Sequence, residues 1–291
     1  MTKPQRILIK TTIPTAEDDW HVGRFSLLAA HLAGLAGDDG APLYAVTARD
    51  RTQTPDGDDA DIAAAADGAY DQLWLFAVDV TGALTPGDSA NIERFRSRGG
   101  GAFLTRDHQD LGYCLTCLGA LGQTQHFQTV NPDPDVSRRC IDDQITTAIS
   151  WPNYHSGANG DFHAIEVEAP LHPLMRRATG EPIRFLPSHP HEGAVGPAAG
   201  LGALSRVVAT GRSQTTGVRF NLMVAVEEPG MGRAVSDASF HHVCNYNWDP
   251  ALGCPSFVGE PPGDGLSRSP EAASDARRYA ENVAAWLARA I

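Results

Sequence analysis

The chain has 291 residues, which is enough to bury the core of one large α/β domain or of two small ones, and we expect one elaborated domain over residues 1–291. Its 35 aspartates and glutamates against 23 lysines and arginines give a net charge of −12, which opposes binding to nucleic acid or to an anionic membrane surface. Five scattered cysteines, no apolar run near the roughly 20 residues that span a bilayer, and a start without a signal-peptide core predict a cytoplasmic protein.

The first half of the chain alternates strand patterns with helix patterns. Apolar, β-branched runs predict strands at residues 6–13, 43–47, 73–78 and 102–105. Helices are expected after a cap at Asp18 and Asp19, from Pro86 to Gly99, and around residues 111–121. The polar run at 49–61 has no apolar period and predicts a surface loop. This order is typical of parallel strands joined by right-handed crossovers.

The second half begins with an irregular segment and then returns to strands. Residues 123–160 are too long for an ordinary connection and predict a lid or pocket wall, with a disordered insertion as the alternative. Closely spaced strands at 183–186, 206–210, 221–227 and 233–235 suit an antiparallel extension of the sheet, and Pro270 opens a last helix. The predicted fold is a three-layer α/β sandwich with a mostly parallel flavodoxin- or Rossmann-like sheet.

A polar turn follows the fourth predicted strand. After three glycines and the strand at 102–105 come Arg106, Asp107, His108 and Asp110. Ligands of open α/β sheets bind beyond the carboxyl ends of the strands, so this turn is a candidate site. The alternative is a solvated turn in which Asp110 only caps the next helix.

Polar clusters follow three other predicted strands. They lie at residues 11–24, with Thr12 and Arg24, at 188–192, and at 237–242. Parallel strands end at one edge of a sheet, so at least the first of these clusters and the turn at 106–110 should share a pocket.

The segment His189-Pro190-His191-Glu192 has the spacing of a metal-binding motif. The proline favours an extended chain with both imidazoles on one side, and His189, His191 and Glu192 could bind a divalent metal such as zinc. The alternative is one packed and one solvated histidine. In the adjacent pair His241 and His242, an extended chain would turn only one ring toward the pocket.

Other motifs carry weaker signals. Asn245 and Trp248 belong to a segment whose amides and aromatic rings suit a small polar ligand such as a sugar, although a lone tryptophan is more often part of a core. Cys114 and Cys117 form a C-x-x-C pair on an apolar pattern, which favours packing over metal binding. The Asp-Pro repeat at 131–135 favours a loop.

Two short motifs, at residues 99–108 and 232–242, carry a resemblance to a known family. A glycine-rich strand with a polar turn, and a late Gly-Arg-x-Val strand followed by serine and histidine, resemble the ThuA-like branch of the class I glutamine amidotransferase-like superfamily. The amidotransferases of that superfamily hold a nucleophilic cysteine in this turn, whereas residues 105–109 read TRDHQ. The resemblance therefore implies the fold without thioester chemistry, and a link to carbohydrate use.

Together these observations predict an enzyme, a hydrolase or lyase that acts on a small polar, carbohydrate-like substrate. Asp107, His108 and His242 are the expected catalytic residues, because imidazole and carboxylate groups transfer protons near neutral pH. Substrate contacts are expected from residues that offer charge, hydrogen bonds or flat apolar surface, namely Thr12, Arg24, Arg106, Tyr154, His155, Asn245 and Trp248. A non-catalytic ligand-binding or assembly module with the same fold is the alternative, and a homodimer is an open option for either.

Overall fold

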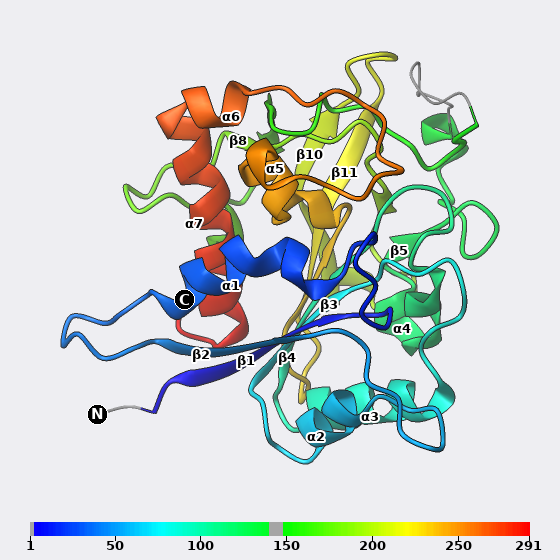
Figure 1. Ribbon diagram of the computed structural model, residues 1–291, viewed down its shortest axis with the longest axis vertical. Coiled ribbons are helices and arrows are strands. Elements are labelled where there is room, and N and C mark those ends of the chain that lie inside the picture. Colours follow the sequence, from blue (N-terminus) through cyan, green and yellow to red (C-terminus); the bar gives the residue numbers. More distant parts are fainter. Residues whose placement is uncertain (1–2, 140–147) are drawn as a thin grey trace.

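The computed structural model describes residues 3–139 and 148–291. Within these residues an eight-stranded sheet has the order β2-β1-β3-β4-β12-β11-β10-β7 (Figure 1). The strands from β2 to β12 are parallel, and β11, β10 and β7 continue the sheet with antiparallel neighbours. The bounds of these strands are β1 Gln5–Thr11, β2 Tyr44–Arg49, β3 Gln72–Phe76, β4 Gly101–Thr105, β7 Glu166–Val167, β10 Ser205–Arg212, β11 Arg219–Val226 and β12 Ala234–Asp237.

Two short strand pairs accompany this sheet. They are β5 (Gln125–His126) with β9 (Ala194–Val195), and β6 (Phe162–Ala164) with β8 (Phe185–Pro187), both antiparallel. The α-helices are α1 Ser26–Ala33, α2 Ala60–Ala66, α3 Pro86–Ser97, α4 Gly119–Gly122, α5 Asn245–Trp248, α6 Gly265–Arg268 and α7 Pro270–Leu287. The 3-10 helices are η1 Val22–Phe25, η2 Tyr113–Cys117, η3 Val136–Arg138, η4 Pro173–Met175, η5 Gly202–Leu204, η6 Phe240–His242 and η7 Pro250–Leu252.

The helices cover both faces of the sheet, so the molecule has three layers. Alternate residues of β1 point to opposite faces: Ile7 and Ile9 pack in one core with α1 and α7, and Leu8 packs in the other with α2 and α3. Figure 1 shows α2 and α3 together, apart from α1 and α7. Burial on both faces explains why β3 is apolar without interruption. The α/β sandwich with a mostly parallel sheet is therefore confirmed.

Two features of the first half differ from the expectation. The run at 49–61 is not a plain surface loop, because Asp50, Arg51 and Asp59 are buried and Asp59 caps α2. The alanine-rich α2 has high helix propensity but few large apolar residues, so periodicity did not reveal it. The expected cap at Asp18 and Asp19 is also wrong, since His21 caps η1.

In the second half the late strands do extend the sheet, but their placement differs in part from the expectation. β12 is not part of the antiparallel extension: it lies in the middle of the sheet, parallel to β4, with Asp237 beside Thr105. The loops that follow β4 and β12 are therefore neighbours. Part of the expected lid at 123–160 lies outside the described residues. No helix of the described chain has the length and apolar character needed to cross a membrane.

Candidate functional site

A cavity of about 860 Å³ opens at the carboxyl ends of the parallel strands, where the sequence placed the site. Its wall is built from the segments after β1, β3 and β4, closed by the loops that follow β8 and β12. We call it the site pocket, and its lining is Ile13, Asp19, Trp20, Val78, Asp79, Val80, Thr81, Asp107, His108, Leu111, Ile149, Asn159, His189, His191, His241, Phe257, Val258, Gly259 and Glu260.

Three potential metal ligands meet in the wall of the site pocket. Asp107 follows β4, His189 follows β8 and His241 follows β12, and one ligand atom of each lies within 4.8 Å of the others. Asp107 Oδ1 is 3.6 Å from His189 Nδ1, and Asp107 Oδ2 is 3.8 Å from His241 Nε2. The two imidazoles stack with ring centres 3.5 Å apart. We call this group the pocket triad.

A hydrogen-bond chain sets the orientation of His241. The Asn247 amide donates to Asn159 Oδ1 at 3.0 Å and to the Ser188 carbonyl at 2.8 Å, which leaves Asn247 Oδ1 as an acceptor. That oxygen is 2.8 Å from His241 Nδ1, so Nδ1 carries a proton. The other nitrogen, Nε2, faces the Asp107 carboxylate. Two atoms with lone pairs face each other stably only with a proton or a cation between them.

Two further histidines stand beside the pocket triad. The His108 ring lies 5.1 Å from that of His191, and its Nδ1 is 3.3 Å from Asp107 Oδ1. His191 Nδ1 is 3.0 Å from Asn153 Oδ1, and His191 Nε2 is 2.8 Å from Glu260 Oε1. Four imidazoles and two carboxylates thus face one pocket in a net negative protein.

Burial and neighbouring charges shift the pKa values in the triad. Burial alone would raise the pKa of Asp107, but His108, His189 and the hydrogen bonds from His108 and His241 hold it well below its usual range. Burial, helped by His241, lowers the pKa of His189 well below its usual value. The triad therefore offers an ionised carboxylate and a neutral imidazole, which are the forms that bind metals.

His242 and Glu192 point away from the site pocket, contrary to the expectation for a catalytic and a metal-binding residue. His242 Nε2 is 3.3 Å from Glu192 Oε1, and His163 Nε2 is 4.0 Å from the same oxygen, behind the pocket wall. His242 diverges from His241 because both lie on the tight turn η6. Glu192 diverges from His191 because successive residues of the extended chain face opposite ways. The expected set of His189, His191 and Glu192 is thus divided between two groups.

The pKa values in this second group also move in opposite directions. Burial lowers the pKa of His163 to about 4. Burial would lower the pKa of His242 as well, but Asp237 and Glu192 raise it to about 10. Burial raises the pKa of the Tyr279 hydroxyl far above its usual value, and Asp237 adds to the effect.

Several expected substrate contacts have structural partners instead. Arg106 is fully buried over the Phe127 ring, 4.2 Å from its centre, and burial lowers its pKa to about 9. The Thr12 hydroxyl donates to Asp79 at 2.6 Å beneath the pocket, and the Arg24 side chain lies near the backbone carbonyls of residues 17 and 19.

The remaining predicted contacts also lie outside the pocket lining. Tyr154 stacks on Phe220, with ring centres 4.7 Å apart, and its hydroxyl donates to a backbone carbonyl. His155 Nδ1 accepts the Gly157 N–H. Asn245 ties the loop after β12 to α1, and the Trp248 indole donates to the His242 carbonyl at 2.9 Å. Their polar groups hold loops together, as alternative interpretations of such residues allow.

Sequence reasoning missed several residues of the pocket. Trp20 lies edge-on to His241 with ring centres 4.8 Å apart, and Asn159 and Glu260 reach the site from distant loops. Trp20 follows two aspartates in the cluster after β1, which was a usable signal. Asn159 and Glu260 lie in segments without a motif, so only the packed chain places them.

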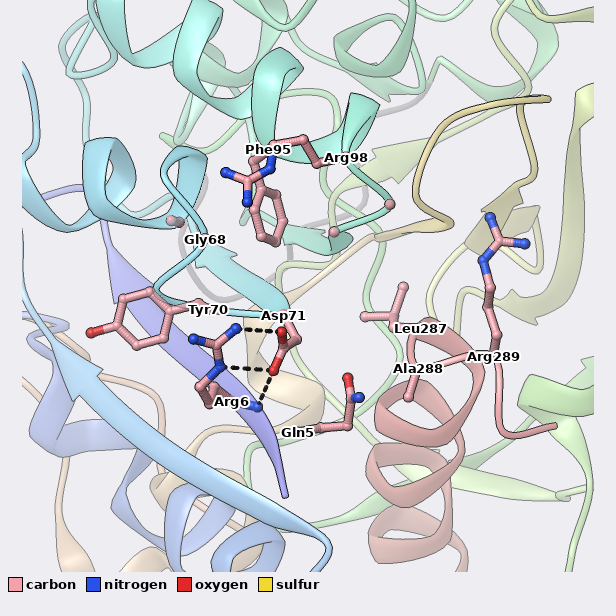
Figure 2. Close-up of a pocket in the computed structure, with 13 residues that line it drawn as sticks. Gln5, Arg6, Gly68, Tyr70, Asp71, Phe95, Arg98, Leu287, Ala288 and Arg289 are labelled. Carbon is pink, nitrogen blue, oxygen red and sulfur yellow. Dashed lines mark hydrogen bonds and ion pairs between the residues drawn. The ribbon is translucent and has the colours of Figure 1, made fainter. Parts of the chain in front are cut away.

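A smaller hollow of about 290 Å³ lies at the opposite edge of the sheet, beside the start of β1 and the end of α7 (Figure 2). Its cationic side chains are already engaged: Arg6 forms an ion pair with Asp71 at 2.6 Å, and Arg98 and Arg289 donate to backbone carbonyls. The hollow lacks the histidine cluster of the site pocket, and its arginine contacts serve the fold.

No protein-family model and no curated protein matches this chain. Among solved structures, it is similar to the glutaminase domain of Trypanosoma brucei CTPS with bound acivicin, at a TM-score of 0.49 and 12% identity over 98% of this chain and 94% of that one. A GMP synthase glutaminase-type neighbour, described by its title as a putative GMP synthase component from Thermoplasma acidophilum, gives a TM-score of 0.42 and 8% identity, covering 100% and 99% of the two chains. Cytoplasmic protein STM3548 from Salmonella typhimurium gives 0.40 and 11%, covering 90% and 96%. These likenesses concern the course of the chain and leave its chemistry open.

Proposed function

We propose that this protein is a metal-assisted hydrolase or lyase that acts on a small polar substrate in the site pocket. The supporting observation is the pocket triad, in which the Asp107 carboxylate faces the lone pair of His241 with His189 beside both. Ligand atoms 3.6 to 3.8 Å apart need only a small inward shift to reach a common ion at metal–ligand distances of about 2.1 Å.

Each residue of the proposed site has a role that its chemistry allows. Asp107, His189 and His241 hold the ion, and Asn247 fixes the His241 tautomer, as a second layer of ligand contacts does in metal sites. The bound ion polarises a substrate oxygen or a water molecule. His108, which is partly exposed in the pocket, is the acid/base group, and His191 with Glu260 binds polar groups of the substrate.

The substrate class follows from the lining of the pocket. Flat apolar surface from Trp20 and Phe257 stands opposite imidazoles and carboxylates, which suits a molecule with hydroxyl groups and one apolar face. The resemblance of residues 99–108 and 232–242 to ThuA-like proteins favours a carbohydrate-like substrate. The turn at 105–109 has no cysteine, so the proposed reaction excludes a thioester intermediate.

Metal analysis of protein purified without a histidine tag tests this proposal. We expect a bound divalent ion that Asp107→Asn abolishes, because the amide removes the charged ligand, with a fall in activity of about 10-fold or more. Asp19→Asn is the matched control, since Asp19 lines the pocket outside the triad. Equal metal content in both variants would contradict the proposal.

A substrate screen then separates an enzyme from a binding module. The metal-loaded protein is tested for thermal stabilisation by sugars, sugar acids and sugar lactones, and each stabilising compound is assayed for turnover. Turnover that His108→Gln reduces without a loss of bound metal supports the enzyme. Stabilisation without turnover by any compound identifies a non-catalytic ligand-binding module instead.

A further inference from the structure

A second group of potential metal ligands lies behind the wall of the site pocket. It consists of His163, Glu192 and His242, whose ligand atoms all lie within 4.8 Å of one another. His163 is 5% exposed and the other two are fully buried. None of the three lines the site pocket. We call this group the buried triad.

The buried triad contains polar atoms without hydrogen-bond partners among the described residues. Neither ring nitrogen of His163 has one, and Glu192 Oε2 also lacks one. A buried polar atom without a partner costs about 1–3 kcal/mol, and more when it is charged. Three such atoms at one point indicate that a bound species is needed to satisfy them.

The surroundings orient these atoms as they do around bound metals. His242 Nδ1 is 2.6 Å from Asp237 Oδ1, which directs its Nε2 at Glu192. The Tyr279 hydroxyl donates to the other oxygen of Asp237 at 2.6 Å, and the Ser156 hydroxyl donates to Glu192 Oε1 at 2.8 Å. A carboxylate behind a ligating histidine is a frequent device for raising ligand basicity and fixing the ring.

Charge balance points the same way. Asp237 and Glu192 are both fully buried, so this part of the core carries two negative charges. One divalent cation on neutral imidazoles would cancel both charges, whereas a proton on His242 alone cancels one. An uncompensated charge in the protein interior costs several kcal/mol.

We propose that the buried triad binds a divalent transition-metal ion, zinc in the first instance, as a structural site closed to solvent. Two imidazoles and a carboxylate are ligands that zinc accepts, and the free Glu192 Oε2 allows a bidentate carboxylate to complete four donors. The site ties β6, the loop after β8 and the turn after β12 together. It shares no ligand with the pocket triad, so it does not rest on the proposed function.

Metal stoichiometry and accessibility test this site. Untagged protein expressed with zinc is dialysed against EDTA under native conditions and analysed by plasma mass spectrometry, then analysed again after unfolding in guanidinium. We expect one ion per chain to resist EDTA and to be released only on unfolding, because the buried triad has no path to solvent. Absence of an EDTA-resistant ion in the wild type would overturn the proposal.

Variants assign the ion to its ligands. Glu192→Gln keeps the size of the side chain and a polar partner for Ser156, and with His163→Phe it should reduce the EDTA-resistant ion from one to none. Asp107→Asn should leave that ion in place. Zinc-edge X-ray absorption of the wild type, which needs no variant to fold, should show only nitrogen and oxygen donors with imidazole scattering.

The outcomes separate the two metal proposals. A single ion that Asp107→Asn removes and Glu192→Gln retains overturns the buried site and leaves the proposed function standing. A single ion with the reverse pattern supports the buried site and contradicts the proposed function. Sulfur donors in the absorption spectrum, or an EDTA-resistant ion that survives Glu192→Gln and His163→Phe, also overturn the buried site.

Discussion

At the residue scale, His172 should make stability depend on pH. Its Nδ1 accepts the Leu174 N–H, its ring lies 5.1 Å from that of Trp286, and burial, with Arg206 and Arg233 nearby, lowers its pKa to about 4. An unfolded histidine titrates near about 6.5, so the unfolded chain binds more protons between pH 6.5 and 4 and folding weakens as the pH falls. His172→Asn keeps the capping acceptor without the titration and should flatten this decline in urea midpoints. Equal declines for the two proteins would contradict the assignment.

At the element scale, a reciprocal cap starts α3. The Thr85 hydroxyl accepts the Asp88 N–H at 3.0 Å, the Asp88 carboxylate accepts the Thr85 N–H at 3.1 Å, and Asp88 also pairs with Arg51 at 2.9 Å. Thr85→Ala removes one half of this box and should lower the free energy of unfolding by about 1 kcal/mol. Thr85→Ser keeps the hydroxyl and should retain most of that stability in urea titrations. If both variants unfold at the same midpoint, the cap does not contribute.

At the scale of the whole molecule, the site pocket depends on a close approach of three loops at Gly193. A Cβ built there would lie 2.4 Å from Arg106 Nη1, 2.5 Å from the Ala238 carbonyl oxygen and 2.7 Å from that of Asp107. Gly193→Ala must therefore push the loop of His189 and His191 outward, at a cost of about 1–3 kcal/mol, and should weaken metal binding by the pocket triad. Gly200→Ala, with nothing within 4 Å of its Cβ, is the matched control. Equal melting temperatures and metal affinities in the two variants would contradict this account.

The same scales explain how far the sequence predicted the site. The turn after β4 was correctly placed at the carboxyl edge of the sheet, because a glycine stop, an apolar strand and a polar turn are local signals. The substrate contacts expected from Arg106, Tyr154 and Asn245 were not found in the pocket lining. A buried polar residue that ties loops together has the same sequence signature as one that binds a ligand, so sequence alone could not separate them.

The sequence by itself determined the alternation of strands and helices, the apolar interior of β3, the start of α3 and the edge at which polar loops gather, since these depend on the spacing of neighbouring residues. Only the tertiary structure decided that β12 enters the middle of the sheet, that His241 and not His242 faces the pocket, and that Glu192 joins His163. The physical reason is that these contacts join residues far apart in the chain. Their geometry follows from how loops pack over a finished sheet, which no local pattern encodes.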